Sequence, residues 1–170
     1  MDTENLLFKI VSYKPTNSNY FLKLADAYNK LFNEKNSLKF LSLTDVPLDL
    51  HTIYSFLKNA SVNEVDYQVA ISPENEIIGI SAFESDIIKG FNVIGMVVDS
   101  NYRGHDIGTS LINKGIEIAN NKGFKAIDIS VFADNKAMLL LLIKMDFKPI
   151  KIEYHVRSDG EDLVHLKKYL

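Results

Sequence analysis

A short polar loop between an apolar run and a helical pattern is the first place in this sequence where the residue types suggest chemistry. The apolar run ends at Asp99, and the loop that follows contains Gly104 and Gly108 around the point where the helical pattern begins. The start of a helix has backbone N–H groups without partners and a partial positive charge, and together they bind phosphate groups. Glycine lets the backbone approach such a ligand closely. The loop therefore predicts an anion site.

An acidic residue, Asp106, lies in the middle of this predicted anion site. A carboxylate about 6 Å from a diphosphate costs about 1–2 kcal/mol in an exposed setting. Aspartate nevertheless tolerates the left-handed backbone conformation better than most residues, and it is a favoured cap at the start of a helix. Two interpretations follow. The loop is either an anion site that accommodates a capping aspartate, or a capped strand-to-helix turn that binds nothing.

The hydrophobic pattern places the loop within an alternating series of strands and helices. Apolar residues at every second position, or in short runs of β-formers, predict strands, and i, i+3, i+4, i+7 spacing predicts helices. The predicted strands are Asn5–Tyr13, Asp66–Ser72, Glu76–Ser85, Phe91–Val98, Ala126–Phe132, Phe147–Arg157 and Glu161–Leu170. The predicted helices are Asn17–Glu34, Pro47–Ala60, Asp106–Asn121 and Asp134–Phe147.

The connections between these elements predict a mixed sheet. The short connector from Pro73 to Asn75 implies an antiparallel hairpin, and another short turn leads into the strand Phe91–Val98. A helical crossover then joins that strand to Ala126–Phe132, which makes these two strands parallel. The order β-α-α-β-β-β-α-β-α-β-β predicts an α/β fold with a mixed sheet, formed as a single domain over residues 1–170.

Composition excludes several kinds of function. The chain has 170 residues, is 46% hydrophobic and has a net charge of -3, so nothing in it indicates nucleic acid or a membrane surface as a partner. It contains no cysteine and only four widely spaced histidines, so we expect no metal site and no thiol nucleophile. The first residues do not form a signal peptide, and no apolar run has membrane-spanning length. The expected location is the cytoplasm.

The loop sequence "VDSNYRGHDIG" carries a family resemblance. It places Val98, Arg103 and Gly108 where GNAT-type acyl-CoA N-acyltransferases have a Val-x-Pro-like turn followed by (Gln/Arg)-x-x-Gly-x-(Gly/Ala) at the start of a helix. Ser100 stands at the usual proline, and Asp106 stands at the first motif glycine. The loop is therefore similar to the cofactor loop of that superfamily, with two departures.

A second segment, "NKAMLLLLIKMDF", resembles the downstream motif Asn-x-x-Ala-x-x-Leu-Tyr-x-x-x-Gly-Phe of the same superfamily. Asn135, Leu141 and Phe147 are kept. Met138 stands at the alanine, Leu142 at the tyrosine and Asp146 at the glycine. The two segments have the separation typical of the superfamily, with a strand between them, and the element order resembles it along the whole chain.

The resemblance implies acetyl-CoA as cosubstrate, without a metal. It implies that Phe91–Val98 and Ala126–Phe132 form a splayed pair of parallel strands, with the pantetheine arm in the gap and the pyrophosphate at the helix start. It leaves open whether the Asn135 amide contacts the pantetheine or only caps its helix. The cofactor-binding residues implied are Met96, Val97, Val98, Arg103, Gly104, His105, Asp106, Ile107, Gly108, Thr109 and Asn135.

The catalytic groups are less well defined than the cofactor loop. The amine must lose a proton, but Phe91–Val98 contains no acid at the position where this superfamily commonly has its base. The candidate base is Glu84 on the preceding strand. The alternatives are Asp86, Tyr154 and His155. Leu142 cannot donate a proton to the leaving thiolate, although a thiolate leaves tolerably without help.

The residues and the family resemblance leave two possible functions. By resemblance, the chain is an N-acetyltransferase that moves an acetyl group from acetyl-CoA to an amine by direct attack in a ternary complex. The amine would belong to a small molecule or a peptide, and the resemblance suggests a homodimer. The alternative is a non-catalytic acyl-CoA-binding domain of the same fold, which Leu142 and the missing strand acid favour.

Overall fold

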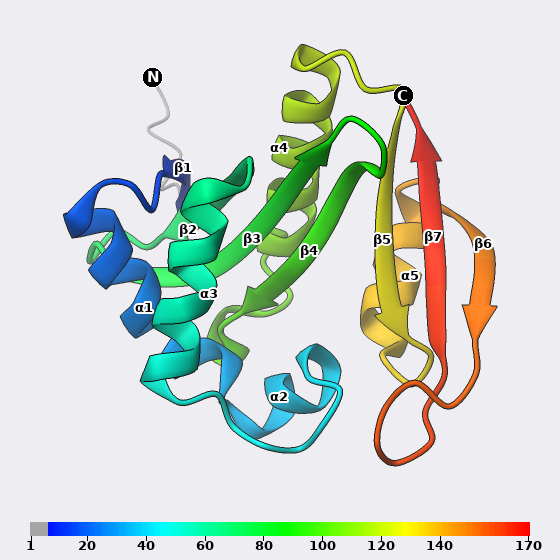
Figure 1. Ribbon diagram of the computed structural model, residues 1–170, viewed down its shortest axis with the longest axis horizontal. Helices are drawn as coiled ribbons and strands as arrows, with labels where there is room; N and C mark the ends of the chain where they lie inside the picture. The colour runs from blue at the N-terminus through cyan, green and yellow to red at the C-terminus, as the bar shows by residue number, and fades with distance from the viewer. Residues whose placement is uncertain (1–6) are drawn as a thin grey trace.

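A seven-stranded mixed sheet with helices on both faces forms the structure, a computed structural model that describes residues 7–170 (Figure 1). The strand order is β1-β2-β3-β4-β5-β7-β6. The strands are β1 (Lys9–Tyr13), β2 (Val65–Ile71), β3 (Ile77–Asp86), β4 (Gly90–Val98), β5 (Ala126–Phe132), β6 (Lys148–Glu153) and β7 (Leu163–Tyr169). The helices are α1 (Ser18–Phe32), α2 (Lys35–Leu41), α3 (Leu50–Val62), α4 (Ile107–Asn121) and α5 (Lys136–Lys144), with a 3-10 turn at Ser100–Tyr102. The predicted mixed α/β fold is confirmed.

Two predictions about the elements were incomplete. The short helix α2 was not predicted, because a seven-residue segment has little periodicity of its own. Its formation depends on tertiary burial of Leu38, which is 8% exposed. The last two strands are shorter than expected and are joined by the long loop 154–162, because the buried side chain of Arg157 draws that loop inward. Positions 5 and 6 of the first predicted strand lie outside the described residues.

Two hydrophobic layers hold the helices against the sheet. On one face α1 and α3 pack over β1–β3 through side chains such as Leu24, Leu57 and Tyr67. On the other face α4 packs mainly over β2, β3 and β4, and α5 packs near Leu166 of β7. Figure 1 shows that α1 and α3 cover only the β1–β4 side of their face, and no helix lies in front of β5, β7 and β6. That part of the sheet is therefore open to solvent on one face.

The neighbouring strands β4 and β5 separate along their length. They are paired in parallel only from Phe91 to Val93 on β4, opposite Ile127 to Ile129 on β5. Immediately afterwards β4 has a bulge, since the register against β3 skips Ile94. Beyond the bulge the strands diverge toward their carboxyl ends, and α2 lies below the open end of the gap (Figure 1). The parallel pair is therefore splayed, as the resemblance implied.

The buried guanidinium of Arg157 joins the two halves of the molecule below this gap. It forms a bidentate ion pair with Asp134, whose two carboxylate oxygens lie 3.1 and 2.7 Å from its two terminal nitrogens. It also bonds Asp159 and donates to the backbone carbonyl of Lys39 at the end of α2. These bonds fix α2 against the second half of the sheet. As a result, the gap has a defined floor.

Candidate functional site

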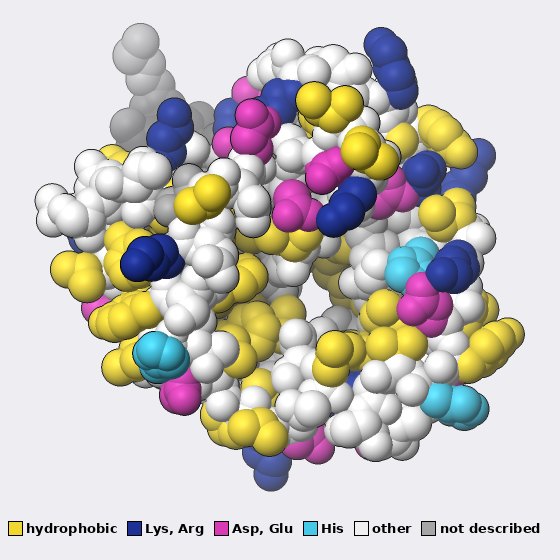
Figure 2. All heavy atoms as spheres, viewed as in Figure 1, with side chains coloured by type: hydrophobic (Ala, Val, Ile, Leu, Met, Phe, Trp, Pro, Cys, Tyr) yellow, Lys and Arg dark blue, Asp and Glu magenta, His cyan; other side chains and the backbone are white. Residues whose placement is uncertain are grey.

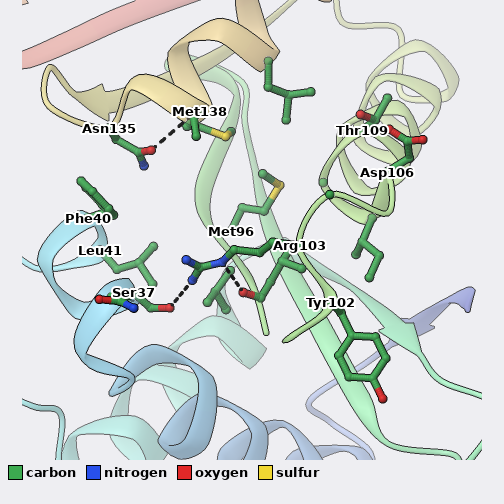
Figure 3. Close-up of a pocket in the computed structure, with 18 residues that line it drawn as sticks. Ser37, Phe40, Leu41, Met96, Tyr102, Arg103, Asp106, Thr109, Asn135 and Met138 are labelled. Atoms are coloured by element: carbon green, nitrogen blue, oxygen red, sulfur yellow. Dashed lines mark hydrogen bonds between the residues drawn. The ribbon is translucent and has the colours of Figure 1, made fainter. Parts of the chain in front are cut away.

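A cavity of about 410 Å³ occupies the gap between the diverging strands, α2 and the start of α4 (Figure 3). It has one lobe at the start of α4 and another along β4. Its walls are Asn36, Ser37, Phe40, Leu41, Met96, Val97, Val98, Tyr102, Arg103, Gly104, Asp106, Ile107, Gly108, Thr109, Asn135, Ala137, Met138 and Leu141. Cavities of this size hold small ligands and cofactors.

The start of α4 contributes free backbone N–H groups to the cavity. The first helical bond from outside the helix runs from the Ser110 N–H to the Asp106 carbonyl. The N–H groups of Ile107, Gly108 and Thr109 therefore have no partner within the helix. An added Cβ at Gly108 would lie 3.4 Å from the Leu141 side chain and 3.7 Å from the Met96 side chain, so the nearest neighbours of this position are side chains that can move. This arrangement suits a diphosphate held by backbone groups and the helix dipole.

Asp106 is the N-cap residue of α4, but its side chain makes no capping hydrogen bond. The expectation that the carboxylate would point back onto the helix is therefore wrong. Its backbone is left-handed, with φ of 59° and ψ of 14°. That conformation turns the chain sharply into the helix, and the side chain then cannot reach the first free N–H groups. The carboxylate remains on the cavity wall.

Asp146 repeats the same backbone conformation at the end of α5, with φ of 66°. Both aspartates stand at positions where the family motifs have glycine. Glycine adopts positive φ without strain, whereas aspartate is among the few other residues that tolerate it. The chain has therefore kept the backbone shape of both motifs while replacing the glycines.

Every second residue of β4 directs its backbone N–H and C=O groups into the gap between β4 and β5. The Asp99 N–H donates to the Ile78 carbonyl of β3, so residues of the same parity, including Val97, bond β3. Met96 and Val98 must then direct their N–H and C=O groups into the gap, where β5 is too far away to pair with them. These groups can bond an extended ligand as a strand would, and an N–H there can stabilise an oxyanion.

Arg103 crosses the cavity from the loop to α2 (Figure 3). Its Nε donates to the Val98 carbonyl at 3.2 Å, and its terminal Nη2 donates to the Ser37 hydroxyl at 2.8 Å. The Nε bond occupies the gap-facing carbonyl of Val98, so an incoming ligand has the Val98 N–H and the backbone groups of Met96 as its free strand contacts. The guanidinium also brings a positive charge into the wall opposite Asp106.

Asn135 both caps α5 and lines the cavity. Its side-chain oxygen accepts a hydrogen bond of 3.2 Å from the Met138 N–H, so the capping alternative is correct. The oxygen is used by the cap, which leaves the amide nitrogen as the group that can contact a ligand. Capping and ligand contact are therefore compatible at this residue.

A second cavity of about 210 Å³ continues the first one between β4 and β5. The two share Phe40, Leu41, Met96, Asn135 and Met138 in their walls, so they lie next to each other. Figure 2 shows an opening on the face that carries α1 and α3, between the two halves of the molecule. A ligand at the start of α4 and a second molecule entering from this opening could therefore meet near Met96.

The structure brings most of the sequence-predicted cofactor residues together. All of them line the larger cavity except His105, whose Nδ1 lies 3.2 and 3.1 Å from the carbonyl oxygens of Tyr102 and Arg103. That contact closes the loop on itself and directs the ring away from the cavity wall. The side chain of His105 therefore supports the loop shape.

The predicted base candidates lie elsewhere. Glu84 lies on β3, paired opposite Asn92 of β4, and lines neither cavity. The Asp86 carboxylate accepts two backbone N–H bonds in the β3–β4 turn, and those bonds lower its pKa. Tyr154 and His155 lie on the exposed loop after β6. None of these groups faces the space in which the two cavities meet.

Sequence reasoning missed two parts of the site. The first is α2, which contributes Ser37, Phe40 and Leu41 to the walls. The second is Ser130 on β5, which lines the smaller cavity. A short helix and a serine within a buried strand give no local signal of function. By contrast, Leu142 is fully buried in the core and lines neither cavity, so it acts in packing.

A family comparison agrees with this geometry. A model described as Acetyltransferase (GNAT) family matches residues 29–147, which is more than half of the chain. The chain belongs to the GNAT acetyltransferase family. One curated relative of this GNAT protein, an uncharacterized N-acetyltransferase of Methanocaldococcus jannaschii, is 37% identical over 51 residues. That match spans 30% of the chain and 23% of the length of the relative.

Solved structures share the GNAT fold over nearly the whole chain. A putative acetyltransferase from Acinetobacter baylyi ADP1 has a TM-score of 0.79 at 16% identity, with 100% of this chain and 95% of that chain covered. A phosphinothricin acetyltransferase from Sinorhizobium meliloti, solved in complex with acetyl-CoA, has a TM-score of 0.79 at 11% identity over 97% and 89% of the two chains. At such low identities the likeness establishes the fold.

The described part of the chain contains neither a metal-binding cluster nor a membrane-spanning helix. Among residues 7–170, no group of three or more histidine, cysteine, aspartate or glutamate side chains is placed to hold a metal ion. Within the same range, no helix has both the length and the apolar character needed to cross a membrane.

Proposed function

We propose that this GNAT protein transfers an acetyl group from acetyl-CoA to an amine of a small molecule or a peptide. The observation that carries the proposal is the space formed by the two adjoining cavities, which extends from the free N–H groups of α4 to the gap-facing peptide of Met96. A diphosphate at one end and a thioester at the other match the two ends of this space. The solved relative with bound acetyl-CoA supports the same cofactor.

The proposed mechanism is direct attack in a ternary complex. The pantetheine arm lies along β4, and the Met96 N–H donates to the thioester oxygen as negative charge develops there. The amine enters from the opening in Figure 2 and attacks the thioester carbon. Holding both reactants in one enclosed space removes much of the entropic cost of their encounter.

The cofactor part of the proposal is tested by Gly108→Glu. The new carboxylate would project where the diphosphate binds, while its Cβ has only ordinary contacts with Leu141 and Met96, so folding should be retained. In calorimetry, Gly108→Glu should lose coenzyme A binding and the matched variant Gly108→Ala should keep most of it. Equal binding by Gly108→Glu and the parent would refute this site.

The catalytic part is tested by thiol release from acetyl-CoA in the presence of an amine panel. The chain has no cysteine, so free thiol arises only from the cofactor. Turnover supports the transferase. Tight coenzyme A binding without turnover would support the alternative, a non-catalytic acyl-CoA-binding domain, which is favoured by the absence of a proton donor at Leu142.

The remaining parts of the proposal concern the setting of the protein. We propose that residues 1–170 act as a single domain in the cytoplasm, with homodimer formation and without nucleic-acid or membrane partners. Support comes from the net charge of -3 and from the family resemblance. Light scattering of the purified chain measures its oligomeric state directly.

A further inference from the structure

A serine, a histidine and a glutamate are aligned across three strands on the open face of the sheet. The Ser130 hydroxyl on β5 lies 2.8 Å from Nδ1 of His165 on β7. Nε2 of His165 lies 3.1 Å from the Glu153 carboxylate on β6, which is within ion-pair distance. The three strands place these groups side by side because Ser130 is paired directly opposite His165.

This row of side chains starts at the smaller cavity. Of the residues that line that cavity, only Ser130 and Asn135 have polar side chains, and the Asn135 oxygen is already used to cap α5. Ser130 is exposed, and no described helix covers this face of β5 (Figure 1). Figure 2 shows a histidine, an acidic and a basic side chain gathered beside the opening on the same face.

The two ring nitrogens of His165 have different neighbours, Ser130 at Nδ1 and Glu153 at Nε2. When the Ser130 hydroxyl donates to Nδ1, the ring must carry its hydrogen on Nε2, next to the Glu153 carboxylate. Hydrogen bonding by Lys151 lowers the pKa of Glu153, which keeps that carboxylate charged beside an imidazolium. The other charged groups on this face, Lys167 and Asp128, form an ion pair of their own.

We propose that Ser130 and His165 form the proton relay that deprotonates the amine acceptor, an inference that rests on the proposed acetyl transfer. The ammonium gives one proton to the Ser130 oxygen as the hydroxyl hydrogen moves to Nδ1 of His165. The neutral amine attacks the thioester, the C–N bond forms and the C–S bond breaks. The second nitrogen proton leaves on the thiol sulfur, and His165 returns its proton to water.

This assignment accounts for two catalytic groups that the chain lacks, an acid on β4 and a hydroxyl at position 142. The base is supplied from β5 and β7, so β4 needs no acid. The thiolate is protonated by the amine nitrogen itself, so the position of Leu142 needs no hydroxyl. Ser130 is the group that touches the acceptor, and His165 acts through it.

The test compares two probe nucleophiles with the whole protein. Propylamine is protonated at neutral pH and needs a base, whereas hydroxylamine is already unprotonated. In His165→Gln, kcat for propylamine should fall about 100-fold with KM little changed, while kcat for hydroxylamine should be retained. Ser130→Ala should show the same selective loss, and the double variant should lose no more than His165→Gln. Lys167→Gln, on the same strand and face, is the matched control and should behave like the parent.

Several outcomes would overturn the relay. Equal losses with both nucleophiles would make His165 a structural residue, and unchanged rates with both would remove it from the reaction. An acetyl group on Ser130 in mass spectrometry would make the serine a nucleophile instead. Parent protein that releases no thiol with these probes or with any amine of the panel would instead refute the proposed function, and the relay with it. Thermal shifts with coenzyme A in all variants confirm that folding and cofactor binding are intact.

Discussion

Removal of the Asp106 charge should tighten coenzyme A binding. The carboxylate makes no capping bond and shares a cavity wall with the free N–H groups of α4. At about 6 Å and an effective dielectric constant of about 40, two unit charges repel by about 1.4 kcal/mol, which is about tenfold in affinity. We therefore expect Asp106→Asn and Asp106→Gly each to bind coenzyme A about tenfold more tightly than the parent.

Two substitutions at Asp106 separate the effect of its charge from the effect of its backbone conformation. Asparagine tolerates the left-handed conformation as aspartate does, so Asp106→Asn changes only the charge. Asp106→Gly also relieves strain, but the greater freedom of glycine in the unfolded chain offsets much of that gain. Its free energy of unfolding should change by less than about 1 kcal/mol. The effect on affinity should shrink as salt screens the repulsion.

Asp146→Gly is the matched control, because Asp146 has the same backbone conformation and lies outside both cavities. Its ion pair with Lys168 is 3.8 Å long and the Asp146 side chain is 89% exposed, so little stability is lost. Calorimetric titration with coenzyme A should show no change in affinity for this variant. Weaker binding by Asp106→Asn would refute the reasoning and make the carboxylate a ligand of the cofactor.

Two further predictions concern stability. Gly115→Ala would place a Cβ 2.2 Å from the Phe83 ring, which is fully buried, so urea unfolding should show a loss of about 1–3 kcal/mol that Phe83→Leu partly restores. An unchanged midpoint would mean that α4 can move away from β3. The hydrogen bonds from Arg157 lower the pKa of Asp134 from 3.8 to about 2, so the native state is favoured by about 2 kcal/mol above pH 4. This stabilisation should be lost as the pH falls from about 4 to about 2, and unfolding curves of Asp134→Asn should lack that step.

The shape of the loop before α4 was predictable from sequence because its residues are contiguous. Gly104, Asp106 and Gly108 follow one another closely, and the local pattern of strand, loop and helix indicates both the turn and its free N–H groups. The left-handed conformation of Asp106 was also anticipated, because few residues tolerate it. The missing capping bond was not, since it depends on where the side chain points once φ is positive.

The acceptor side of the site was not predictable in the same way. Ser130, His165 and Glu153 are far apart in the sequence, and each has an ordinary strand neighbourhood. They become neighbours because β7 is inserted between β5 and β6 in the sheet. Glu84 was a candidate base because it lies near the end of the strand that precedes β4 in the sequence. In the structure its side chain lines neither cavity.

The sequence by itself determined the order of the strands and of the four longer helices, the parallel crossover and the glycine loop before α4, because local periodicity and short connections encode them. Only the tertiary structure decided where β4 and β5 part, how α2 and Arg157 form the floor of the gap, and which polar groups face it. These features depend on strand pairing and side-chain burial between residues distant in the chain. That long-range packing is the physical reason why the loop before α4 was predictable from sequence, whereas the row formed by Ser130, His165 and Glu153 was not.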